Sequence, residues 1–277
     1  MVRRYHSGPV ISEETPAAGD LHYERCGPPG GASVVLLHGL GSSARDWQWQ
    51  VAAFQERYRV ITLDLPAHGR SAFRRGPRAE PLRVEAMAAA VGRLLTRLGE
   101  GPVHVVGLSL GGCVALALAI AAPTRVRSLT LVNAFARLRP AGWRGAYRML
   151  ERLVLLAVAP MPVIAARVAQ NLFPGPEQGE LRAAAAASLG RNDKRAYFAA
   201  ARALTRFDAR RRLAEIRCPT LIVAGEVDRT VPRTSAEFLQ GGIPDARLLI
   251  VPGSGHATPY DQPDLFNRLV LEFVSAH

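Results

Sequence analysis

The chain has 277 residues, of which 48% are hydrophobic and 21% charged, and its formal net charge is +12. These values are typical of a soluble globular protein that is long enough to bury a sizeable core. Three widely spaced cysteines without a CxxC pair argue against a disulfide framework and a zinc site, and they fit a reducing compartment.

The sequence contains no recognisable targeting or membrane segment. Residues 1–20 include two arginines but no apolar stretch of the length that a signal peptide needs. The longest apolar run, residues 153–166, is too short for a membrane span and is interrupted by Pro160 and Pro162. We therefore expect a cytoplasmic protein without a transmembrane segment.

Strands and helices alternate over most of the chain. The patterns predict strands at 21–25, 33–37, 59–64, 103–107 and 127–132, helices at 83–98 and 109–122, and later strands at 219–225 and 246–253. The strand at 33–37 is almost entirely apolar, as expected where both faces of a sheet are covered. The alternation predicts an α/β fold with a mostly parallel sheet covered by helices on both faces.

Residues 134–213 interrupt this alternation. They are expected to be mainly helical, and they contain five prolines and no convincing strand. The simplest prediction is an α/β core domain formed by residues 1–133 and 214–277, with residues 134–213 inserted as a helical cap.

The predicted cap carries most of the excess positive charge. It contains 15 basic and 5 acidic residues, whereas the rest of the chain has a net charge of +2. Two interpretations stay open: a solvated face of an arginine-rich protein, or a docking site for an anionic partner such as an acidic carrier protein, an anionic lipid surface or a carboxylated substrate. No nucleic-acid recognition motif accompanies the charge. The arginines at the start of this segment are Arg137, Arg139, Arg144 and Arg148.

One serine stands between two glycines at a strand-to-helix junction. The sequence Gly107-Leu108-Ser109-Leu110-Gly111 follows an apolar strand and opens a helix, which is the context of a nucleophile elbow. Glycines tolerate the close approach of the chain in such a turn, and the helix N-terminus favours developing negative charge. We expect Ser109 to be the nucleophile.

A serine hydroxyl needs a base, and the base needs an orienting carboxylate. Asp228 follows the strand at 219–225, and His256 follows the strand at 246–253. We predict that His256 is the base and that Asp228 orients it, with Glu226 left open as a minor alternative acid.

The remaining polar candidates have simpler explanations. Asp64 is expected to hold the turn that follows its strand, and Asp261 to cap the last helix. Asn133 ends the strand at 127–132 but cannot carry a negative charge. Cys113 is interpreted as a small core residue.

Catalysis by a serine also requires donors for the oxyanion. The strand at 33–37 ends in His38-Gly39-Leu40-Gly41, where glycine frees the following amide to point into a site. We assign the backbone N–H groups of Leu40 and Leu110 to the oxyanion hole. His38 is expected to hold the loop rather than to act as a base.

Four segments in this order carry a family resemblance: "LLHGLGSS", "LDLPAHGRS", "VVGLSLGG", and the pair "GEVDRTVP" and "GSGHATP". Over nearly its whole length the chain resembles the α/β-hydrolase superfamily, in the branch of serine carboxylesterases, enol-lactonases and esterases of carrier-bound acyl chains. The resemblance implies an acyl-enzyme, no cofactor or metal, and a cap between the sixth and seventh core strands that roofs the acyl site. Epoxide hydrolases and haloalkane dehalogenases carry Asp where this chain has Ser109, which argues against those activities.

The expected function is hydrolysis of carboxylic esters, namely small to medium apolar acyl esters or lactones. Alternatives are a C–C bond hydrolase or a carrier-protein acyl ester hydrolase with the same triad, or a non-catalytic small-molecule receptor on the same fold. Some of the apolar side chains of the predicted cap should line the acyl pocket: Phe135, Trp143, Met149, Leu156 and Met161.

Overall fold

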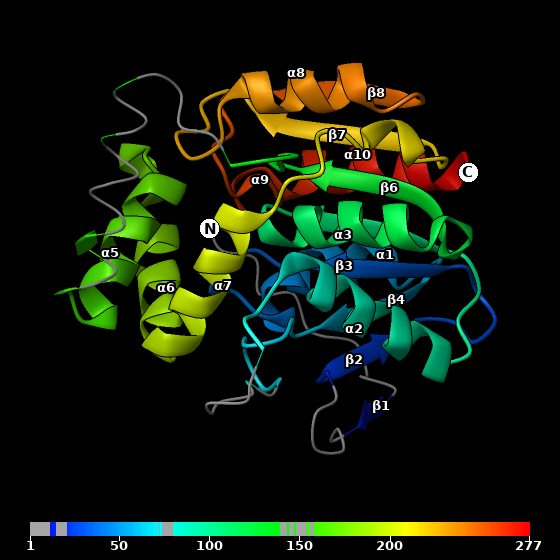
Figure 1. Ribbon diagram of the computed structural model, residues 1–277, viewed down its shortest axis with the longest axis horizontal. Helices are drawn as coiled ribbons and strands as arrows, with labels where there is room; N and C mark the ends of the chain where they lie inside the picture. Colours follow the sequence, from blue (N-terminus) through cyan, green and yellow to red (C-terminus); the bar gives the residue numbers. More distant parts are fainter. Residues whose placement is uncertain are drawn as a thin grey trace.

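The computed structural model describes residues 12–14, 21–71, 73, 80–138, 143, 147, 154–155 and 158–277. An eight-stranded sheet runs through the molecule in the order β1-β2-β4-β3-β5-β6-β7-β8 (Figure 1). Its strands are β1 (Ser12–Glu14), β2 (Tyr23–Cys26), β3 (Ser33–Leu37), β4 (Arg59–Leu63), β5 (Val103–Leu108), β6 (Val126–Val132), β7 (Thr220–Gly225) and β8 (Ala246–Val251). The strands from β3 onward pair in parallel, whereas β1 and β2 add an antiparallel edge.

Helices cover both faces of the sheet. The buried cluster on one face includes α2 (Val84–Arg97), α3 (Leu110–Ala121) and α8 (Arg233–Gly242). The cluster on the other face includes α1 (Gln48–Phe54) and α10 (Pro263–Ser275). Successive residues of β3 join opposite clusters because side chains alternate along a strand. The predicted α/β class with a mostly parallel, doubly covered sheet is therefore confirmed.

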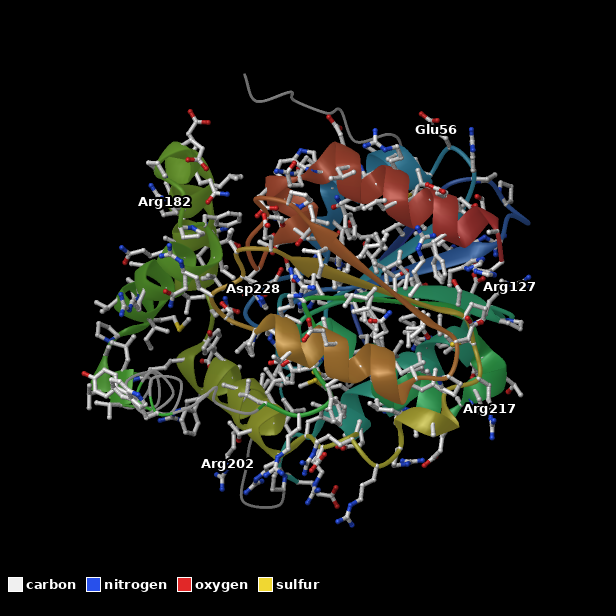
Figure 2. The ribbon with its side chains drawn as sticks, turned by 90° about the horizontal axis from the view of Figure 1, so that it is seen from above. Glu56, Arg127, Arg182, Arg202, Arg217 and Asp228 are labelled. Carbon is white, nitrogen blue, oxygen red and sulfur yellow. The ribbon has the colours of Figure 1, made fainter. Side chains whose placement is uncertain are left out.

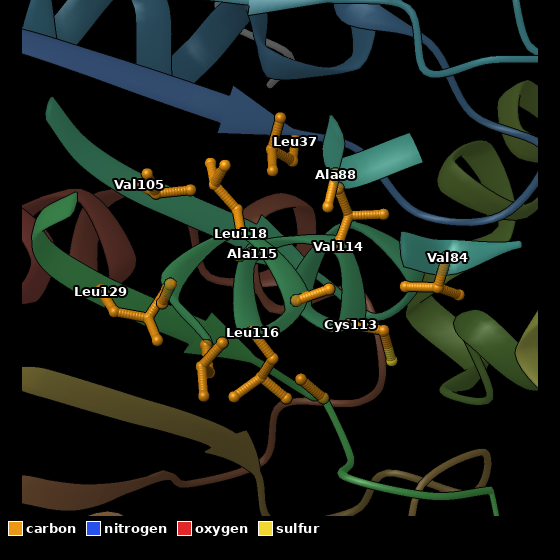
Figure 3. Packing of buried hydrophobic residues seen from close by; sticks show 14 of the residues in the cluster. Leu37, Val84, Ala88, Val105, Cys113, Val114, Ala115, Leu116, Leu118 and Leu129 are labelled. Atoms are coloured by element: carbon orange, nitrogen blue, oxygen red, sulfur yellow. The ribbon is translucent and has the colours of Figure 1, made fainter. Parts of the chain in front are cut away.

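Helix α3 is the most deeply buried helix of this arrangement. Figure 3 shows its residues Val114 and Leu118 near Leu37 of β3 and Ala88 of α2, and all four belong to one buried cluster. A helix that is apolar all round requires such burial. This packing fixes the position of the helix that begins directly after Ser109.

Among the described residues, three α-helices with defined bounds lie between β6 and β7, in the segment predicted to be the cap. They are α5 (Met161–Leu172), α6 (Gly179–Gly190) and α7 (Lys194–Arg206). Figure 1 shows them at the end of the sheet where the parallel strands finish. An isolated antiparallel bridge joins Arg137 to Asp208, where the segment leaves the sheet and returns.

The predicted elements are recovered with shifts of one or two residues at their ends. The structure adds the short strand β1, which the sequence patterns did not predict, and it makes β2 antiparallel to its neighbours. No helix in the described ranges is long and apolar enough to cross a membrane. Cys26, Cys113 and Cys218 are all buried free thiols, as expected for Cys113.

Two buried histidines should make the fold sensitive to acid. Burial, with a smaller contribution from His38, lowers the pKa of His68 to about 3. Burial, with smaller contributions from Arg127 and His277, lowers the pKa of His104 to about 4. In the unfolded chain both histidines take up a proton below pH ~6.5. Their contribution to the free energy of unfolding is therefore fully present above that pH and is lost as the pH falls toward ~4.

We expect the free energy of unfolding, measured with urea, to decline below pH ~6.5 by up to about 1.4 kcal/mol per pH unit for each of the two histidines. His104→Gln removes one titrating group, so about one proton fewer should be taken up on unfolding. The slope of the free energy of unfolding against pH should become shallower accordingly. An unchanged slope in the variant would show that His104 takes up its proton equally in both states.

Candidate active site

Ser109 occupies a strained turn between β5 and α3. Its backbone angles, φ 52° and ψ −108°, lie in a region that non-glycine residues rarely adopt. A Cβ atom on Gly107 would lie 2.4 Å from the Gly111 oxygen, and one on Gly111 would lie 2.1 Å from the Leu37 oxygen. Both glycines are therefore required by close approach of the backbone, as the elbow interpretation predicts.

The loop after β3 forms a tight turn beside this elbow. The Ser42 amide donates to the Gly39 oxygen at 3.2 Å, and Gly41 adopts φ 77°. Leu40 occupies the second position of the turn and lines the same cavity as Ser109. Leu110 is the first residue of α3, so its amide has no acceptor within the helix. Both amides therefore belong to the two backbone turns that flank Ser109, and their oxyanion role stays a prediction.

The helices between β6 and β7 contact this loop. A Cβ atom on Gly41 would lie 2.6 Å from Leu189 Cδ2 and 2.7 Å from Tyr197 Cε2. The Asn192 amide donates to the Gly41 oxygen at 2.7 Å. The shape of the loop thus depends on the seating of α6 and α7, which the sequence patterns did not reveal.

His38 and Asp64 hold the backbone of these loops, as predicted. The Leu65 amide donates to His38 Nε2 at 2.9 Å, and His38 Nδ1 donates to the Gly39 oxygen at 2.8 Å. Burial lowers the pKa of His38, which keeps the ring neutral. Asp64 accepts from the amides of Ala44 and Arg70, each at 2.7 Å. Neither side chain is free to act as a base.

Asp228 and His256 form a buried pair at the ends of β7 and β8. His256 Nδ1 lies 2.7 Å from Asp228 Oδ2, and the two side chains are 6% and 4% exposed. The other carboxylate oxygen accepts from the amides of Thr230 at 2.6 Å and Val231 at 3.0 Å. Since an ionised carboxylate only accepts, Nδ1 carries the proton and Nε2 is left as the basic nitrogen. Figure 2 shows Asp228 at the end of the core that faces α5 and α6.

The competing acids lie elsewhere. Glu226 is exposed and accepts from the Gly253 amide at 2.9 Å. The prediction that Asp261 caps the last helix is wrong, because Gln262 occupies that N-cap. Asp261 instead ends α9 (Thr258–Asp261) and accepts from Ser254 Oγ at 2.8 Å and the Gly255 amide at 2.7 Å. Its carboxylate therefore holds the loop in front of His256, a role that depends on tertiary contacts.

Asn133, at the end of β6, stabilises the same loop through hydrogen bonds. Its amide group donates to the backbone oxygen of His256 at 2.7 Å and to Thr258 Oγ1 at 2.9 Å. Its side-chain oxygen accepts from the Gly225 amide at 2.8 Å, at the end of β7. Asn133 is 3% exposed. One side chain thus connects the strand end before Asp228 with the backbone of His256.

We expect Asn133→Asp to lower kcat by about 10²-fold while KM changes little, because a carboxylate cannot donate to the His256 oxygen and the ring shifts. Steady-state kinetics with a chromogenic ester measures both constants. Asn267→Asp is the matched control: Asn267 is also buried and donates to the Trp49 oxygen, away from His256. A similar loss of kcat in both variants would attribute the effect to instability instead.

Ser109, Asp228 and His256 line one cavity of about 2150 Å³. The Ser109 hydroxyl makes no hydrogen bond within the described part of the chain, so its contact with His256 stays a prediction. Unliganded sites often close such contacts only when substrate binds.

The residues predicted to line the acyl pocket divide into three groups. Phe135 and Trp143 line the cavity, whereas Met161 is buried among the helices and does not. Met149 and Leu156 lie outside the described residues, as do Arg139, Arg144 and Arg148.

Arg137 pairs with Asp208 at 3.6 Å. Because Arg137 is already paired, it agrees with the interpretation of these arginines as a solvated face rather than as a docking site for an anionic partner.

Curated relatives match nearly the whole chain. The "putative carbamate hydrolase RutD" of Azorhizobium caulinodans is 36% identical over 261 residues, which cover 92% of this chain and 94% of that protein. The 3-oxoadipate enol-lactonase 1 of Acinetobacter baylyi is 30% identical over 265 residues, which cover 90% of this chain and 91% of that protein.

A solved structure and a family agree with these relatives. The enol-lactonase from Burkholderia xenovorans superposes with a TM-score of 0.83 at 26% identity, covering 92% of this chain and 96% of that chain. The family described as alpha/beta hydrolase fold matches residues 32–263. The chain therefore belongs to the alpha/beta hydrolase fold family and is a hydrolase.

Proposed function

We propose that the protein is a serine hydrolase that cleaves carboxylic esters or lactones through an acyl-enzyme. The observation that carries this proposal is the Asp228–His256 pair at 2.7 Å in the cavity that Ser109 also lines. The relatives named as an enol-lactonase and a carbamate hydrolase support it, since both names describe cleavage at a carbonyl carbon.

In the proposed reaction His256 Nε2 takes the Ser109 proton while Oγ forms a bond to the carbonyl carbon. The carbonyl oxygen becomes an oxyanion that the amides of Leu40 and Leu110 stabilise. The bond to the leaving oxygen then breaks, and His256 returns the proton to that oxygen. Water repeats the sequence on the acyl-enzyme and releases the acid and free Ser109.

We further propose that residues 134–213 act as a cap over this cavity, inserted into a core of residues 1–133 and 214–277. Side chains of α5, α6 and α7 contribute to the cavity lining, and Asn192 bonds to the loop that carries Leu40. The volume of about 2150 Å³ exceeds that of typical small-molecule pockets, so the cavity admits esters of small to medium size but does not select for them.

A p-nitrophenyl ester series with increasing acyl length tests the proposal. An initial burst of one p-nitrophenol per protein molecule, followed by a slower steady rate, is the result expected from an acyl-enzyme. Turnover of p-nitrophenyl carbamates in parallel measures the preference for ester over carbamate. Binding of these compounds with no release of p-nitrophenol would favour the small-molecule receptor instead.

A further inference from the structure

The turn after β3 contains a chain of hydrogen bonds that begins in the proposed cap. Asn192 Nδ2 donates to the Gly41 oxygen at 2.7 Å. The same peptide unit carries the Ser42 N–H group, which donates to the Gly39 oxygen at 3.2 Å. The peptide unit of that oxygen carries in turn the Leu40 N–H group. The Asn192 side chain is therefore connected, through successive peptide units, to an amide that is predicted to bind the oxyanion.

The direction of the Leu40 N–H group follows from these contacts. No peptide bond in the described part of the chain is cis, and in a trans unit the N–H and C=O groups point in opposite directions. The Gly39 oxygen accepts from the Ser42 amide and also from His38 Nδ1 at 2.8 Å. The Leu40 N–H group therefore points away from both donors, and it donates to no acceptor among the described residues.

This turn lies against the elbow that carries Ser109. A Cβ atom on Gly39 would lie 3.8 Å from the Leu108 oxygen, and one on Gly111 would lie 2.8 Å from the His38 oxygen. Residues of the turn line the same cavity as Ser109. The N–H group in question thus belongs to a turn that borders both the elbow and the cavity, as a donor to an oxyanion on Ser109 must.

Asn192 is itself held in place between two helices. It follows α6, where its backbone N–H donates to the Leu189 oxygen at 3.1 Å and its Nδ2 donates to the same oxygen at 3.0 Å. The next residue, Asp193, caps α7 by accepting from the Ala196 amide at 2.9 Å. Both partners of Nδ2 are carbonyl oxygens, which only accept, so the NH₂ group must face them. The side chain is therefore oriented in the absence of substrate.

Apolar packing already holds these helices on the turn. Leu189 and Tyr197 are buried, and they lie against Gly41 from α6 and α7. Such contacts have no preferred direction, whereas a hydrogen bond has one. The bond from Asn192 therefore adds a fixed orientation of the peptide unit that follows Gly41.

The chain of hydrogen bonds also transmits polarisation. A donor at the Gly41 oxygen makes the N–H group of the same peptide unit a stronger donor. That N–H group acts on the Gly39 oxygen, so the Leu40 N–H group is polarised in the same way. The Asn192 side chain thus favours both the direction and the strength of the donor that an oxyanion needs.

We propose that Asn192 is a positioning residue for catalysis: through the Gly41 oxygen it orients and polarises the Leu40 N–H group that binds the oxyanion. This inference rests on the proposed function, because it connects a residue of the proposed cap to the oxyanion hole of the same site. A cap that is seated on the turn therefore completes the oxyanion hole.

Two ketones of the same chain length separate an effect on the oxyanion from an effect on the cavity: 1,1,1-trifluorooctan-2-one and octan-2-one. With the first, Ser109 Oγ bonds to the carbonyl carbon, the Ser109 proton moves to His256 Nε2, and the carbonyl oxygen becomes an oxyanion. Octan-2-one binds in the cavity without such an adduct. The ratio of their inhibition constants should be about 10² or more in the wild type. The ratio is measured on folded protein, so a lower yield of a variant does not change it.

Asn192→Ala removes the donor, and Asn192→Asp removes it while keeping the shape of the side chain. In both variants the inhibition constant of the trifluoro ketone should rise about tenfold, while that of octan-2-one stays unchanged. The kcat for a p-nitrophenyl ester should fall by the same factor at unchanged KM, because an interaction made only in the transition state is weakened. Asn171→Asp adds a charge at an exposed position of α5 and should leave the ratio of the inhibition constants unchanged.

An unchanged ratio in both Asn192 variants would overturn the proposal. An equal rise of the two inhibition constants would also overturn it, since Asn192 would then only seat the cap. A change in Asn192→Asp without one in Asn192→Ala would attribute the effect to the new charge and would be equally fatal. If the wild type hydrolyses no p-nitrophenyl ester and fluorine NMR detects no adduct with the trifluoro ketone, the proposed function itself has failed, and this inference with it.

Discussion

Ser109→Ala should lower kcat for ester hydrolysis by about 10⁶-fold and prevent covalent labelling by an organophosphate or a sulfonyl fluoride. Without Oγ no acyl-enzyme can form, while the oxyanion donors and the cavity stay in place. A small residual rate over water is therefore expected. Mass spectrometry of the labelled wild type should find the adduct on the peptide that contains Ser109.

Another serine of the cavity provides the control for this experiment. Ser188 on α6 lines the same cavity, and Ser188→Ala should be labelled at the wild-type rate. If Ser109→Ala keeps its activity while the label is found on Ser42 or Ser254, the nucleophile is not Ser109.

Asp228→Asn should lower kcat by about 10⁴-fold. The amides of Thr230 and Val231 would hold the asparagine oxygen where Oδ1 lies now. The asparagine NH₂ group would then face His256 Nδ1, which must become an acceptor, so the proton moves to Nε2. With Nε2 protonated, His256 cannot take the Ser109 proton.

His256→Ala should cost a comparable factor, and the double variant hardly more, because the two residues act as a unit. Glu226→Gln is the control, since that carboxylate is exposed and bonded to the Gly253 amide. Near-wild-type activity in Asp228→Asn combined with an inactive Glu226→Gln would move the orienting acid to Glu226.

Much of the fold could be predicted because the relevant signals are local. The strands of the sheet core are apolar on both faces, and prolines and glycines mark where helices stop. The antiparallel edge of the sheet could not be predicted in the same way. β2 contains partly buried polar residues, and its antiparallel partner β4 is separated from it in the chain by β3 and α1, so the pairing depends on tertiary contacts.

The candidate catalytic residues could be chosen without the structure. Ser109, Asp228 and His256 each follow an apolar strand, and parallel strands end at one edge of a sheet, so all three were expected at that edge. The distinction between Asp228 and Glu226 required the structure, because the path of a loop decides which of two nearby carboxylates turns inward.

The contacts that support these residues could not be predicted in this way. Asn133 bonds to the backbone of His256, and Asn192 bonds to the loop that carries Leu40. Each contact joins residues far apart in the chain, and none leaves a periodic or spaced pattern in the sequence. A buried amide finds its acceptors only when the packing of several elements has fixed where those acceptors lie.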